Sequence, residues 1–111
     1  MNTPIALALV ALLAGGAWTA AAQKSKKPVS HTVTMDATSF SPASLTVAPG
    51  DSVTWVNKDL IPHTATSKQS GAFDSGTITP GESWKLTVKA KGELAYICQF
   101  HPAMKGTLRV Q

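Results

Sequence analysis

The chain has 111 residues, a formal net charge of +4 at pH 7 and a single cysteine. This length suits one domain with a modest hydrophobic core. Lys24, Lys26 and Lys27 account for most of the net positive charge, so the rest of the chain is nearly neutral and carries no basic stripe. Such a stripe, or a basic helix, is typical of nucleic-acid-binding proteins. The composition therefore argues against a nucleic-acid partner.

The first 22 residues have the character of a signal peptide. Residues 5–14 are a short apolar run, and Ala20 and Ala22 fit the small-residue site for cleavage before Gln23. An uncleaved membrane anchor is the open alternative, because residues 5–22 carry no charge, although this stretch only just reaches spanning length. We expect an exported, periplasmic protein with a signal peptide at 1–22, a flexible lead-in at 23–29 and a folded domain at 30–111.

Beyond residue 29, short runs of alternating apolar and polar residues are separated by turn residues. Alternation with β-branched and aromatic residues is typical of half-buried strands, and no stretch after Gln23 keeps helical periodicity over three turns. The sequence therefore predicts an all-β fold, a β-sandwich. The expected strands, in chain order, are residues 31–35, 44–47, 52–56, 83–89, 94–98 and 107–110.

The loop after the fifth expected strand gathers side chains that bind metals. Cys98 ends this strand, and His101 and Met104 follow at three-residue steps, with Pro102 fixing the backbone between them. Upstream, His63 offers a second imidazole from another loop. One cysteine, two histidines and a weakly bound methionine form the ligand set of a blue-copper electron-transfer site.

Each of these residues has an ordinary structural explanation when it is taken alone. A lone cysteine such as Cys98 is usually a small core residue, His101 would be a surface histidine, and Met104 would fill a gap in the core. Their joint occurrence indicates a metal site instead. In addition, a single thiol in an exported protein must be buried or occupied, because it has no internal disulfide partner.

Two other kinds of site fit these residues less well than copper does. Structural zinc needs four Cys or His ligands, and only three such residues converge here. His31 would be the fourth, but it lies in the first expected strand, where we expect a structural role. A catalytic Cys–His pair needs a base that reaches the thiol and a third group that orients the base, and the tight loop offers neither.

The Cys-x2-His-x2-Met loop, the Asn-x5-His segment that begins at Asn57 and the closing Gly-Thr-Leu-Arg-Val strand resemble the cupredoxins. The short loop is most similar to the amicyanin type, and more broadly to the plastocyanin type. The resemblance covers residues 40–110 and includes Tyr96, two residues before the cysteine. It implies a Greek-key sandwich with copper at one end and Asn57 hydrogen-bonding between the two ligand loops. The implied ligands are His63, Cys98 and His101 in the equatorial positions and Met104 in the axial one.

This resemblance implies a periplasmic electron carrier, not an enzyme, that holds one type 1 copper per chain. We expect a monomer with transient redox protein partners and with no membrane association unless the signal segment is uncleaved. A copper-binding or copper-delivery protein of the same fold is the alternative. An oxidase or reductase would need a second copper and further histidines, and only His31 is left over. Six apolar residues are candidates for a docking surface around His101: Leu60, Ile61, Pro62, Phe100, Pro102 and Ala103.

Overall fold

The computed structural model describes residues 27–111. The expected signal peptide and residues 23–26 of the expected lead-in lie outside this part of the chain, while residues 27–29 precede the first strand. A membrane-crossing helix is absent from residues 27–111.

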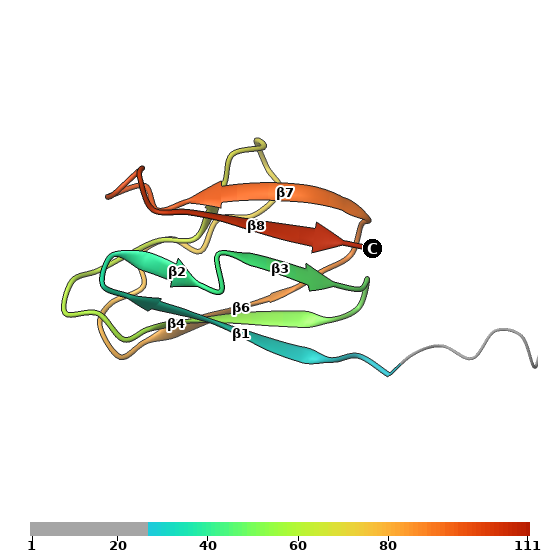
Figure 1. The fold of residues 1–111 in the computed structure, drawn as a ribbon, viewed down its shortest axis with the longest axis horizontal. Coiled ribbons are helices and arrows are strands. Elements are labelled where there is room, and N and C mark those ends of the chain that lie inside the picture. Colours follow the sequence, from blue (N-terminus) through green and yellow to red (C-terminus); the bar gives the residue numbers. More distant parts are fainter. Residues whose placement is uncertain (1–26) are drawn as a thin grey trace, which may run out of the picture.

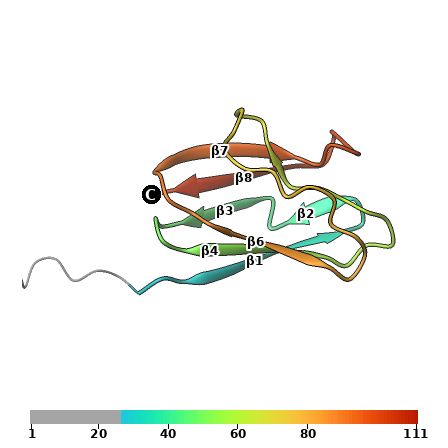
Figure 2. The same cartoon turned by 180° about the vertical axis from the view of Figure 1, so that it is seen from behind.

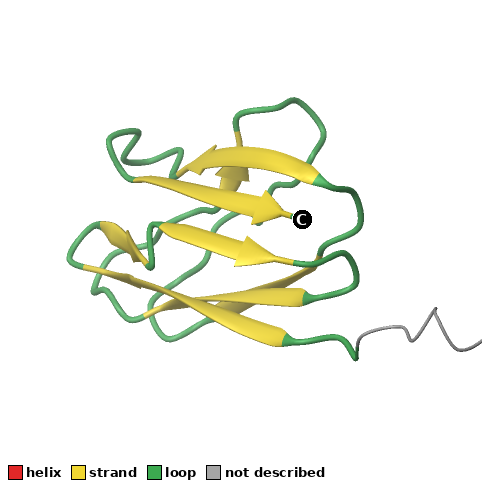
Figure 3. Cartoon of the chain, turned by 45° about the vertical axis from the view of Figure 1, so that its right-hand side comes forward, coloured by secondary structure: helices red, strands yellow, loops and turns green. Residues whose placement is uncertain are grey.

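The described residues form eight strands and no helix (Figure 3). All six expected strands are confirmed, although their ends differ by a few residues. Two further strands, β2 and β5, are only three and two residues long. In chain order the strands are β1 (Ser30–Asp36), β2 (Ser39–Ser41), β3 (Ser44–Val47), β4 (Ser52–Asn57), β5 (Thr66–Ser67), β6 (Ser83–Thr87), β7 (Gly92–Ile97) and β8 (Lys105–Val110).

The strands form two sheets, ordered β2-β1-β4-β6 and β3-β8-β7-β5, which pack as the two layers of a sandwich (Figure 1). The pairings β1–β4 and β3–β8 are parallel, and the other strand pairings are antiparallel. Consecutive strands repeatedly change sheets, so neighbours within each layer come from distant parts of the sequence. The predicted all-β, Greek-key sandwich is confirmed.

Alternation along the strands places the core between the two sheets. In β4, Val53, Trp55 and Asn57 face inward and are fully buried, while the residues between them are half-buried. Trp55 lies at the centre of an aromatic cluster, with its ring 5.4 Å from that of Tyr96 and 5.5 Å from that of Trp84. This cluster joins the β4 layer to the β7 layer, which is drawn above it in Figure 2.

Tyr96 in β7 lies against Gly106 in β8, its direct partner in the antiparallel register. A Cβ atom at position 106 would lie only 2.2 Å from Cζ of the tyrosine ring, so only glycine fits there. Burial raises the pKa of Tyr96 to about 12. The phenol is therefore neutral at physiological pH and serves as part of the core.

Candidate metal centre

The predicted ligands come from two loops at one end of the sandwich. Cys98 directly follows β7, and His101 and Met104 lie in the loop from β7 to β8, at the left of Figure 1. His63 lies between β4 and β5, where its backbone pairs with that of Ile78 through two hydrogen bonds of 2.7 and 3.1 Å. Both loops are therefore anchored close to the ends of sheet strands.

Three donor atoms converge in this place. Sγ of Cys98 lies 3.7 Å from Nδ1 of His63 and 3.8 Å from Nδ1 of His101. The three atoms lie within 4.8 Å of one another, and this is the only such cluster of His, Cys, Asp or Glu side chains in residues 27–111. His63 and Cys98 are fully buried, whereas His101 is half-buried. A single ion could contact all three atoms without rearrangement of the loops.

Backbone hydrogen bonds fold the Cys98–Met104 loop onto itself. The Cys98 carbonyl accepts a bond from His101 N–H at 3.3 Å, and the His101 carbonyl accepts one from Met104 N–H at 2.8 Å. The Met104 carbonyl in turn accepts a bond from Cys98 N–H at 3.1 Å. These bonds bring the buried Met104 back beside Cys98, as a fourth ligand requires.

Thr64, which the sequence analysis did not single out, ties the two ligand loops together. Its N–H donates to Sγ of Cys98 at 3.3 Å, and its hydroxyl oxygen accepts a bond from Gln99 N–H at 2.9 Å. An N–H bond to sulfur stabilises the charge of a thiolate, which is the form of cysteine that binds metals. In the sequence, the only sign that Thr64 connects the two ligand loops is its position next to His63.

Asn57 was expected to hydrogen-bond between the two ligand loops, and this expectation was wrong. The Asn57 amide nitrogen donates to the carbonyls of Ile61 at 2.9 Å and Ile78 at 2.8 Å, and its oxygen accepts a bond from Asp59 N–H at 2.9 Å. Asn57 therefore fixes the shape of the His63 loop and attaches it to the segment before β6. Asn57 makes no side-chain hydrogen bond to the Cys98–Met104 loop in residues 27–111, and the bonds between the two loops are made by Thr64 instead.

His31 lies at the opposite end of the sandwich from the three donor atoms, since it pairs with Val53 near the start of β4. Its Nε2 lies 2.9 Å from Oδ2 of Asp51. This hydrogen bond, together with bonds from the N–H groups of Val29 and Ala48, lowers the pKa of Asp51 to about 2. His31 is thus part of a structural pair and not a fourth nitrogen ligand.

Exposed apolar side chains lie on both ligand loops. Leu60 is 92 % exposed and Phe100 is 49 % exposed, and exposed apolar residues gathered in one region are typical of docking surfaces. The other members of the expected docking surface, Ile61, Pro62, Pro102 and Ala103, are exposed as well.

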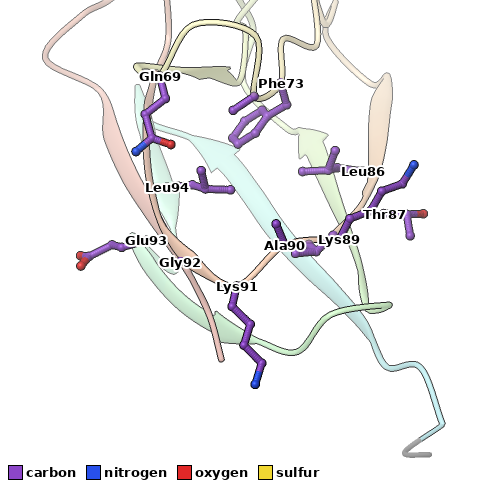
Figure 4. Close-up of a pocket in the computed structure, with 12 residues that line it drawn as sticks. Gln69, Phe73, Leu86, Thr87, Lys89, Ala90, Lys91, Gly92, Glu93 and Leu94 are labelled. Atoms are coloured by element: carbon purple, nitrogen blue, oxygen red, sulfur yellow. The ribbon is translucent and has the colours of Figure 1, made fainter.

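A separate pocket opens near the start of β7, at the end of that strand away from Cys98. Phe73, Leu86 and Leu94 form its apolar floor, and Lys89 and Lys91 lie at its mouth (Figure 4). Its lining contains no histidine, cysteine or methionine, so it is distinct from the cluster of donor atoms.

Residues 5–110 match the family model described as cupredoxin-like domain, and the chain belongs to this family. It is 30% identical over 122 residues to an amicyanin of Paracoccus versutus, covering 96% of this chain and 91% of that protein. It is 34% identical over 84 residues to a plastocyanin of Scenedesmus fuscus, covering 65% and 86%. The structure of a purple cupredoxin from Nitrosopumilus maritimus matches with a TM-score of 0.69 at 26% identity, covering 73% and 99%.

The donor set fits the copper of a blue copper cupredoxin. The cysteine sulfur and two imidazoles lie together. Backbone hydrogen bonds tie Met104 to Cys98, and its thioether suits copper far better than zinc. His63, Cys98, His101 and Met104 are positioned to form one type 1 site.

Proposed function

We propose that this protein is a one-electron carrier that holds one type 1 copper ion between His63, Cys98, His101 and Met104. The observation that carries the proposal is the convergence of one sulfur and two imidazole nitrogens within 4.8 Å at the end of a rigid sandwich. Bound there, copper would supply a couple that exchanges single electrons. Membership of the cupredoxin-like family supports the same function.

The surroundings of the donor atoms suit electron transfer better than turnover of a substrate. The hydrogen bonds within the loop from Cys98 to Met104, and those made by Thr64, hold the ligands in one arrangement. A site that hardly moves needs little reorganisation when its charge changes. The Cys98 sulfur and the His63 ring are buried and do not contact solvent. His101 is half-buried and is therefore the ligand that reaches the surface.

The exposed apolar residues around His101 support short-lived contacts with redox proteins. Leu60 and Phe100 would dock directly beside the ligand that leads to the surface. Encounters of this kind use small interfaces, below about 1,200 Å² in total. We further propose that the protein is a monomer, exported to the periplasm after removal of residues 1–22, with the cupredoxin domain at 30–111.

The visible spectrum of the copper-loaded protein tests this function. Cu(II) bound to the Cys98 thiolate should give an intense blue charge-transfer band, and Cys98→Ser should abolish it. His101→Gln should alter the band strongly, whereas His31→Gln, the matched control at the other end of the sandwich, should leave it unchanged. A colourless adduct of the unaltered protein would overturn the assignment. Rapid loss of the bound copper to a chelator would favour copper delivery over electron transfer.

A further inference from the structure

We propose that Asp59 is a positioning residue of this centre: its carboxylate fixes the tautomer of His63 and places a negative charge behind this ligand. The inference rests on the proposed function, because it treats His63 as a ligand through Nδ1.

The contact between Asp59 and His63 defines which ring nitrogen carries the proton. Oδ2 of Asp59 lies 2.9 Å from Nε2 of His63, whose side chain is fully buried. The same carboxyl group accepts hydrogen bonds from two backbone N–H groups, and an aspartate in such a setting is ionised at neutral pH. An ionised carboxylate only accepts hydrogen bonds, and the proton must therefore lie on Nε2. The lone pair of Nδ1 is then directed toward Cys98, 3.7 Å away.

The carboxylate itself is held in place from two sides. Oδ2 of Asp59 accepts a hydrogen bond from Thr38 N–H at 2.9 Å, and Oδ1 accepts one from Leu60 N–H at 3.0 Å. Asp59 N–H donates to Oδ1 of Asn57 at 2.9 Å, which fixes the backbone as well. The turn between β1 and β2, far away in the sequence, thus contributes to the position of a ligand.

The two imidazoles of the centre are therefore not equivalent. In the part of the chain that the structure describes, Asp59 is the only carboxylate hydrogen-bonded to a ligand histidine. The polar contact of the His101 ring is with Sγ of Cys98. Second partners of metal-bound histidines raise their basicity and hold their rings in place. In addition, a fixed negative charge favours the more positive oxidation state of a bound cation, so it lowers the reduction potential.

A matched pair of aspartates provides the test. Asp59 and Asp51 each bond Nε2 of a histidine at 2.9 Å, the first beside the centre and the second at the far end of the sandwich. Asp59→Ala removes both hydrogen bond and charge, Asp59→Asn keeps an acceptor but removes the charge, and Asp51→Asn is the control. Melting temperatures of all variants identify any that fail to fold.

The first measurement needs no metal. Nitrogen NMR of the apoprotein should show His63 entirely as the Nε2–H tautomer, and Asp59→Ala should give a mixture of tautomers. The second is affinity for Cu(I) and Cu(II), which should fall about 10- to 100-fold in Asp59→Ala. The third is the reduction potential, which should rise in Asp59→Asn and stay unchanged in Asp51→Asn.

An Nδ1–H tautomer of His63 in the unaltered apoprotein would overturn the inference, as would equal potentials in Asp59→Asn and Asp51→Asn. Both outcomes leave the proposed function standing if the unaltered protein binds copper with a blue colour. Failure of the unaltered protein to bind copper would instead refute the proposed function, while the tautomer measurement would still decide the role of Asp59.

Discussion

At the scale of single residues, the contact between Tyr96 and Gly106 links the core to the metal centre. Tyr96 lies two residues before Cys98, and Gly106 lies two residues after Met104. The tyrosine ring packs against Phe40 at 4.7 Å and Trp55 at 5.4 Å, so it cannot move aside to admit a side chain at position 106. The strands that carry the ligands therefore keep their spacing only with glycine at this position.

Gly106→Ala should destabilise the apoprotein by about 1–3 kcal/mol, the usual cost of overpacking a core. Urea unfolding measures this free energy. In the double variant with Tyr96→Leu the added methyl group has room, so the combined loss should be smaller than the sum of the two single losses. Strictly additive losses would show that the clash is relieved elsewhere.

At the scale of elements, the turn between β1 and β2 has a backbone conformation that its two central residues, Ala37 and Thr38, rarely adopt. Ala37 and Thr38 have φ values of 50° and 56°, and Asp36 and Ser39 are paired across the turn. Positive φ at both central residues is the type I′ geometry, for which Asn-Gly is preferred, and a β-branched residue is strained there. The bond from Thr38 N–H to Asp59 helps to hold this conformation.

Replacement of Ala37 and Thr38 by Asn and Gly should therefore stabilise the protein by roughly 1–2 kcal/mol. The backbone N–H at position 38 remains, so the reduction potential of the copper-loaded protein should not change. Chemical denaturation and voltammetry on the same samples check both statements. A stabilised variant with an altered potential would mean that the turn has moved away from Asp59.

The start of β1 is attached to the turn before β4 by Asp51, and this attachment should depend on pH. The folded pKa of about 2 lies below the unfolded value of 3.8, so the ionised carboxylate stabilises the fold above pH 4. This stability is lost as the pH falls from about 4 to about 2. The pKa of Asp59 is also lowered in the folded protein, so ionised Asp59 likewise adds stability that is lost as the pH falls. Unfolding free energies measured across this range should show a weaker acid dependence in Asp51→Asn than in the unaltered protein.

The strands that could be predicted from the sequence are those that have four or more residues and a clear alternation of apolar and polar residues. β2 and β5 were missed because two or three residues are too few to show a period, and pairing with a neighbour defines them. The ligand set was visible because three of its members share one short loop. Asp59 was not, because a carboxylate four residues before a histidine reaches the ring only when the loop between them has the right shape. Thr64 was not, because its role depends on which loops meet in space. The same reason explains the wrong partner for Asn57, whose amide bonds Ile78 across the fold.

At the scale of the whole molecule, processing of the N-terminus decides whether the carrier is free to diffuse. The small residues Ala20 and Ala22 favour cleavage before Gln23. Mass analysis of the exported protein should therefore find a chain that begins at Gln23 or within a few residues of it. A product that keeps residues 1–22 and fractionates with membranes would show an anchored protein instead.

The parallel pairing of β3 with β8 governs when the chain can fold. Within residues 27–111, β3 lies at the edge of its sheet and has β8 as its only strand partner, although residues 48–104 separate them in the sequence. Closing such a long loop costs entropy before any contact repays it, so folding through distant pairings is slow. During synthesis β8 emerges after the other seven strands, and the ligand loop directly before it remains open until then. We expect the nascent chain to remain without its complete fold until β8 has emerged, and to acquire its metal only after release.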